Sequence, residues 1–100
     1  MAIAQATIIP VGTGSTSLSS YVAACENILK DEKEIKYQLT PMCTIFEGEL
    51  DTIIKVIRKM HEIPFENGAE RVITSISIDD RRDKKASMEQ KLNSVREKLK

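Results

Sequence analysis

The sequence predicts an α+β fold, because segments with strand periodicity and segments with helix periodicity follow one another along its 100 residues. Runs of β-branched residues alternate with polar ones, apolar residues recur at spacings of three and four, and proline or glycine separates the segments. An apolar content of 41% over this length can build one core but not two. We therefore expect residues 1–100 to form a single domain.

Four segments are predicted to be strands. They are rich in small or β-branched residues, or they alternate apolar with polar residues, and each is followed by a turn residue or a polar connector. These strands are expected at 3–9, 35–39, 42–47 and 71–78.

Three segments carry the apolar spacing of helices. The first runs from Leu18 to Leu29 behind a capping Ser17, and the second starts near Glu49 and stops before Pro64. The third begins at a capping box of Ser and Gln and has a narrow apolar seam with heptad-like spacing. Its capping residues are Ser87 and Gln90, and its seam is Met88, Leu92, Val95 and Leu99.

The resulting order, β-α-β-β-α-β plus a C-terminal helix, predicts a ferredoxin-like sandwich. Its four-stranded antiparallel sheet would carry the first two helices on one face, with the first and third strands central. If Ala4 and Ala6 face the helices, then Ile3 and Ile9 face away, together with polar neighbours. That second face is too apolar for open solvent, so we expect a partner subunit to cover it.

Composition restricts the partners and the compartment. Fifteen basic and fifteen acidic residues give zero formal net charge, which argues against nucleic acid or an anionic membrane as a partner. No apolar run approaches the roughly 20 residues that span a bilayer. Cys25 and Cys43 fit core positions of a protein in a reducing compartment, so we expect a cytoplasmic protein.

The residues offer little for catalysis. His61 is the single histidine, and no cysteine or acidic pair stands around it at metal-ligand spacing. We therefore expect a protein that is not an enzyme and holds no metal or cofactor. RNA binding is a weaker alternative, because Phe46 is the lone aromatic on the predicted central strands and no basic-aromatic motif accompanies it.

The segment 44–48 is the best candidate for binding a small molecule. Glu47 would stand at a strand end with Phe46 beside it and the Thr44 hydroxyl three residues earlier. A carboxylate in such a place can pair with an amino-bearing or cationic ligand, while Phe46 or Tyr37 stacks on a flat ring. The alternative is a strand that simply ends at a helix-capping acid.

Several blocks of the sequence, in one order, resemble the small thiamine-binding protein family related to YkoF. The resemblance implies a ferredoxin-like fold, tetramers formed through the sheets, and binding of thiamine or its pyrimidine half without known catalysis. The matching blocks are 6–14, 18–22, 37–42, Thr44 with 47–49, 71–72 and 78–84.

By the same resemblance, Ser20, Thr44, Glu47 and Asp79 are the expected ligand-binding residues, and Phe46 joins them as a stacking partner. The sequence thus predicts a homotetramer that binds thiamine or its aminopyrimidine moiety in the cytosol, for buffering or delivery. The alternative is a structural or regulatory homo-oligomer with another small ligand.

Overall fold

The computed structural model describes residues 1–14, 18–84 and 87–99, and its elements follow the predicted order. Neighbouring strands in the order β2-β3-β1-β4 are all antiparallel, as expected for the predicted fold class. Ser17, the expected cap of the first helix, lies outside the described residues. The elements are β1 (Ala2–Val11), α1 (Ser19–Leu29), β2 (Lys36–Leu39), β3 (Thr44–Gly48), α2 (Leu50–Glu66), β4 (Arg71–Asp79) and α3 (Met88–Lys98).

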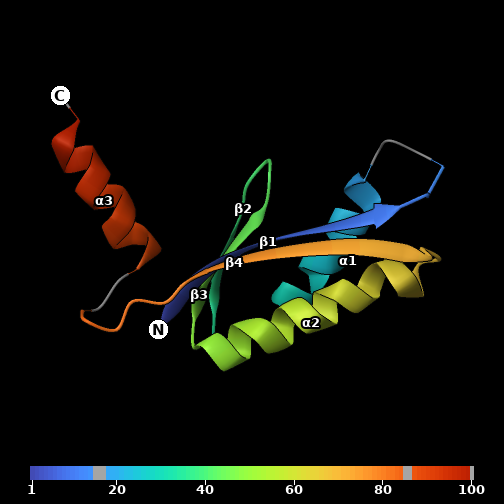
Figure 1. Ribbon diagram of the computed structural model, residues 1–100, viewed down its shortest axis with the longest axis horizontal. Helices are drawn as coiled ribbons and strands as arrows, with labels where there is room; N and C mark the ends of the chain where they lie inside the picture. The colour runs from blue at the N-terminus through green and yellow to red at the C-terminus, as the bar shows by residue number, and fades with distance from the viewer. Residues whose placement is uncertain (15–17, 85–86, 100) are drawn as a thin grey trace.

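Two layers make up the body of the molecule. Helices α1 and α2 lie against one face of the sheet, here called the helix face, and α3 stands apart beyond one end of the strands (Figure 1). Ala4 pairs with Phe46 on one side and Ile78 on the other, which places these side chains on the helix face. The fold is therefore the predicted ferredoxin-like α+β sandwich.

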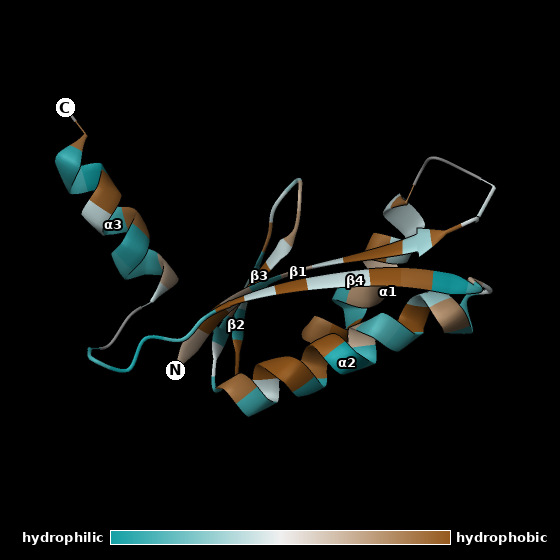
Figure 2. Ribbon diagram, in the orientation of Figure 1, coloured by the Kyte–Doolittle hydropathy of each residue, from teal (hydrophilic) through white to brown (hydrophobic). Residues whose placement is uncertain are grey.

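The centre of the sheet is built from small residues. Ala2, Ala4 and Ala6 of β1 are buried under the helices, where their size lets large side chains of α2 reach the sheet. Polar residues interrupt the apolar stretches of β1 and β4 (Figure 2). The opposite face of β1, here called the open face, carries Ile9, whose side chain is 43% exposed.

Strand β1 does not end before Pro10, as the sequence suggested, but continues to Val11. Pairing with β3 stops at Ala6, so the second half of β1 has β4 as its partner and an open edge on the other side. Proline is tolerated on such an edge because no neighbouring strand needs its missing N–H.

The prediction that the second helix stops before Pro64 is also wrong. Helix α2 runs through Pro64 to Glu66, and Pro64 is buried. A proline cannot donate to the carbonyl four residues earlier, which is that of Met60. The thiol of Cys25 on α1 donates to this carbonyl instead, at 3.5 Å, so the contact between the two helices replaces the lost bond.

Gly48 ends β3 in a crowded place. A Cβ on this residue would lie 2.8 Å from Cγ2 of Ile35 and 3.4 Å from the carbonyl oxygen of Glu34. We expect Gly48→Ala to lower the free energy of unfolding by about 1–3 kcal/mol, the usual cost of overpacking. Urea denaturation measures this, with the exposed Ser75→Ala on β4 as control. Equal stability of Gly48→Ala and wild type would show that Ile35 moves aside freely.

The buried thiol of Cys25 predicts a loss of stability in alkali. Burial, with the nearby charge of Glu26 second, raises the pKa of Cys25 from 9.0 to about 11. Between these values the folded chain holds a proton that the unfolded chain releases, so unfolding becomes easier as the pH rises from 9 to 11. The loss should approach about 2 kcal/mol. Urea denaturation across this pH range should show that the free energy of unfolding falls more steeply for wild type than for Cys25→Ala. Parallel declines of the two proteins would contradict this prediction.

Candidate functional site

A pocket of about 350 Å³ opens on the helix face between α1 and the β2–β3 hairpin; we call it the hairpin pocket. Most of its wall is apolar, and among the described residues no lysine or arginine lines it. Leu18, the residue before α1, and Val22 and Cys25 of α1 lie on its wall and belong to the apolar stripe that binds this helix to the body. The other lining residues are 6–9 of β1, Glu26 of α1, 39–44 of the hairpin and Met60 of α2.

The hairpin that forms one wall is held by Thr40. Its N–H donates to the carbonyl of Cys43 at 2.8 Å, and its hydroxyl accepts from the N–H of Cys43 at 3.1 Å. These bonds close residues 40–43 into a turn, so β3 begins at Thr44 and not at Met42 as expected. The rim of the hairpin pocket is therefore a braced turn.

Glu26 supplies the polar chemistry of the hairpin pocket. The Thr44 hydroxyl donates to its Oε1 at 2.5 Å, which fixes the carboxylate against β3. Its other oxygen, Oε2, is buried and has no hydrogen-bond partner among the described residues. A buried carboxylate oxygen without a partner is costly, and a ligand that donates a hydrogen bond removes that cost.

Sequence reasoning missed Glu26, although the pattern contains a signal. Glu26 lies four residues after Val22 and three before Leu29, so it interrupts the apolar stripe of α1. An acidic residue on the buried side of a helix is unusual unless it has a partner. That partner, Thr44, is 18 residues away in the sequence and is brought close by packing of α1 on the sheet.

Two of the predicted site residues lie on the helix face, as Glu26 does. Thr44 lines the hairpin pocket and orients Glu26. Phe46 is fully buried in the core beneath the helices, so its ring has no surface on which a ligand could stack. Ser20 is exposed in the first turn of α1 and is not part of the pocket lining.

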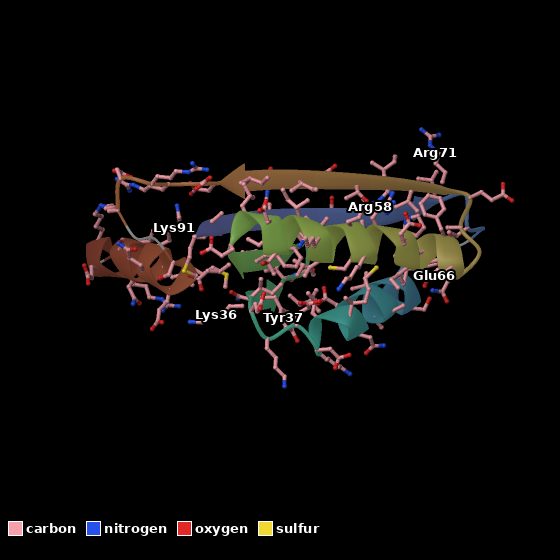
Figure 3. The ribbon with its side chains drawn as sticks, turned by 90° about the horizontal axis from the view of Figure 1, so that it is seen from below. Lys36, Tyr37, Arg58, Glu66, Arg71 and Lys91 are labelled. Atoms are coloured by element: carbon pink, nitrogen blue, oxygen red, sulfur yellow. The ribbon has the colours of Figure 1, made fainter. Side chains whose placement is uncertain are left out.

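Glu47 and Asp79 lie on the open face. Both pair with Ile3 in the register of the sheet, so the three side chains form a row across that face. Glu47 is only 4% exposed, and its Oε1 accepts the N–H of Met88 at 3.1 Å at the start of α3. Asp79 binds Lys91 of α3 at 2.6 Å, with Lys36 of β2 near the first turn of the helix (Figure 3).

Within one chain the structure does not bring Ser20, Thr44, Phe46, Glu47 and Asp79 together, and their role in ligand binding stays a prediction. Neighbouring residues of a strand point to opposite faces, so Thr44 and Glu47, three apart, cannot share one. Glu47 does lie at a strand end and accepts a backbone N–H from the first turn of a helix, but that helix is α3.

No helix within the described residues is long and apolar enough to cross a membrane. No group of three or more histidine, cysteine or acidic side chains in that part of the chain is arranged to hold a metal ion.

The chain is similar in sequence and in fold to known proteins. YqgV from Bacillus subtilis is 54% identical over 102 aligned residues that cover 99% of this chain and 98% of that protein. A crystal structure from Methanocaldococcus jannaschii, 35% identical, superposes with a TM-score of 0.85 over 96% of each chain. A Thermotoga maritima protein with a provisional role in thiamine biosynthesis or salvage shares the fold, with a TM-score of 0.76 at 18% identity over 94% of this chain and 97% of that one.

The family comparison agrees with the resemblance found in the sequence. The model of the family described as "Thiamine-binding protein" matches residues 4–96, which is nearly the whole chain. This chain therefore belongs to the thiamine-binding protein family.

Proposed function

We propose that this protein binds thiamine, or its aminopyrimidine half, in the hairpin pocket with Glu26 as the acceptor. The observation that carries the proposal is the buried Oε2 of Glu26, which has no hydrogen-bond partner among the described residues, in a mostly apolar pocket of about 350 Å³. Such a pocket has the size of a small-molecule site, and Glu26, the one charged group among its described lining residues, can orient the ligand.

The chemistry of thiamine fits this arrangement. The exocyclic amino group of the pyrimidine donates to Oε2, while Oε1 stays bonded to Thr44. The permanent positive charge of the thiazolium ring is attracted to the same carboxylate, and no cation among the described lining residues opposes it. Apolar ring surface packs against the side chains of α1 and the hairpin.

The proposed role is binding without catalysis. The described lining residues place no histidine, lysine or second carboxylate near Glu26, so the pocket offers a hydrogen-bond acceptor but no general acid and base pair. Membership of a family of binding proteins supports the same reading. We propose that the protein buffers or delivers its ligand in the cytosol.

Glu26→Gln tests the site directly. The substitution keeps the shape of the side chain but removes its charge, and we expect thiamine to bind about ten- to a hundredfold more weakly by isothermal titration. Glu47→Gln is the matched control, because Glu47 lies on the opposite face and already accepts the N–H of Met88.

The two glutamate variants also separate two positions for the site. Weakened binding in Glu47→Gln and unchanged binding in Glu26→Gln, with unchanged circular dichroism, would return the site to the residues expected from the sequence. Wild-type protein that binds neither thiamine nor the free pyrimidine would refute the proposed function.

We further propose that the protein works as a homotetramer and that its open face is one of the contacts. Ile9 and Ile73 are paired neighbours on that face, with exposed fractions of 43% and 47%. A β-branched pair exposed on the two-stranded end of the sheet favours cover by another subunit. A second copy of the chain offers the same surface in a two-fold arrangement.

Ile73→Asp tests this contact. A charge placed without a partner in an apolar interface costs several kcal/mol, so the variant should form smaller assemblies than wild type at micromolar concentration. Light scattering measures the mass, with Ser94→Asp on α3 as the control. If Ile73→Asp has the mass of wild type, the open face is not a subunit contact.

A further inference from the structure

A second cavity, of about 780 Å³, lies where the connector after β4 meets the start of α3; we call it the basic cavity. Its described lining holds four cationic side chains and no acidic one, although the formal net charge of the chain is zero. It shares no described lining residue with the hairpin pocket. Its described lining is Met1, Lys36 of β2, Arg81, Arg82 and Lys84 of the connector, and Ser87 and Gln90 at the start of α3.

The fold creates this charge from a connector that is nearly balanced in sequence. Three acids and four bases alternate in 79–85, and Figure 2 shows the connector as a hydrophilic stretch between β4 and α3. Asp79 binds Lys91 of α3 at 2.6 Å, while Asp80 and Asp83 bind the two arginines of the connector. None of these three acids lines the basic cavity, so its surface carries one sign of charge.

The aspartates hold the two guanidinium groups without using all of their donors. Asp83 accepts from Nε and Nη2 of Arg81 at 2.5 and 2.8 Å, and Asp80 accepts from the same two atoms of Arg82 at 3.2 and 2.8 Å. The Nη1 group of each arginine has no hydrogen bond within the described residues. A guanidinium is planar, so the aspartate that binds one edge fixes the plane and leaves the Nη1 donors for a ligand.

The two lysines of the basic cavity have no ion pair within the described part of the chain. Lys36 lies opposite Glu47 in the register of the sheet and beside the start of α3 (Figure 3). Lys84 comes from the connector, so the cations enter the cavity from two separate segments. Like charges brought together in this way repel one another until an anion binds between them.

Neutral donors at the start of α3 add to the cationic ones. The Ser87 hydroxyl accepts the N–H of Gln90 at 3.0 Å and keeps its own proton to donate, and the side-chain amide of Gln90 has two further N–H groups. The positive end of the helix dipole favours an anion at the same place. Every described polar side chain of the lining can therefore donate to an anion.

The type and spread of the donors indicate a diphosphate. Guanidinium groups bind phosphate oxygens two at a time, and lysines supply compact charges beside them. Four cations from two segments are more than one phosphate needs, and a cavity of about 780 Å³ leaves room for an organic group attached to the diphosphate. A chain with zero net charge lacks the long-range field that attracts a long polyanion, so the ligand is expected to be small.

We propose that the basic cavity binds the diphosphate group of a small molecule. Arg81, Arg82, Lys36 and Lys84 are its cationic contacts, with neutral donors from the start of α3. This second site lies apart from the hairpin pocket and does not rest on the function proposed for that pocket.

Isothermal titration with inorganic pyrophosphate at constant ionic strength tests the site. Wild-type protein should bind one pyrophosphate per chain, and Lys36→Gln and Lys84→Gln should each weaken binding roughly tenfold, because each removes a charged hydrogen bond. Arg82→Lys keeps the charge but removes the planar fork, so it should also weaken binding. Lys55→Gln is the matched control, because Lys55 is exposed on α2 outside the basic cavity and its replacement changes the net charge equally.

Two further titrations distinguish the sources of the diphosphate. Pyrophosphate carries the group free and adenosine diphosphate carries it on an organic molecule, so the tighter of the two identifies the kind of ligand. Inorganic phosphate should bind more weakly than either, because it contacts fewer cations.

Two outcomes would overturn the proposal. One is a wild-type protein that shows no saturable binding of pyrophosphate or adenosine diphosphate. The other is an equal loss of affinity in Lys36→Gln and Lys55→Gln, which would indicate a response to net charge alone. Glu26→Gln should bind pyrophosphate as wild type does, so a failure of the thiamine site leaves this test unaffected.

Discussion

The pleat of β3 divides the chemistry of this protein between two faces of one sheet. Thr44 points to the helices and holds Glu26 at 2.5 Å, while Glu47 points away and holds the first turn of α3 at 3.1 Å. Five residues, Thr44–Gly48, thus support both the hairpin pocket and the position of α3. Because β3 is central, between β2 and β1, neither side chain can move without disturbing the sheet.

The Oε2 of Glu26, which lacks a partner among the described residues, is the physical basis of the proposed preference for a cationic donor. Withdrawing a carboxylate from water costs several kcal/mol unless hydrogen bonds compensate, and here Thr44 compensates one oxygen only. A ligand that donates a hydrogen bond to Oε2 would remove the remaining cost and gain affinity from its removal. Thr44 keeps the carboxylate in one orientation before binding, which lowers the entropy lost when the ligand arrives.

The sequence was sufficient for the fold because its periodicities are strong and local. Alternation in 71–78 and the capping box at Ser87 both correspond to observed elements, β4 and the N-terminal cap of α3. The errors have tertiary causes. Pro64 lies inside α2 because Cys25 of another helix takes the carbonyl it leaves free, and no local pattern encodes that contact.

The candidate site was harder to predict because the pocket is built from segments far apart in the sequence. Residues 44–48 were identified as important, but their division between two faces follows from the register with β1, which a linear pattern does not show. Glu26 was overlooked because one acid on an apolar stripe resembles a surface residue until its partner on β3 is known. The resemblance to a family supplied the ligand class, and only packing could supply the acceptor.

Helix α3 is anchored on the face of the sheet opposite the hairpin pocket. Its anchors, Glu47 and Asp79, are both on the open face, whereas the hairpin pocket is on the helix face. Helix α3 therefore lies away from the hairpin pocket, whose described lining contains no residue of that helix. The hairpin pocket and α3 are linked through β3. This strand pairs with β1 on one side and β2 on the other, so it resists displacement. A rigid link of this kind transmits no change unless the ligand shifts the strand, so each subunit is expected to bind its ligand independently of the others.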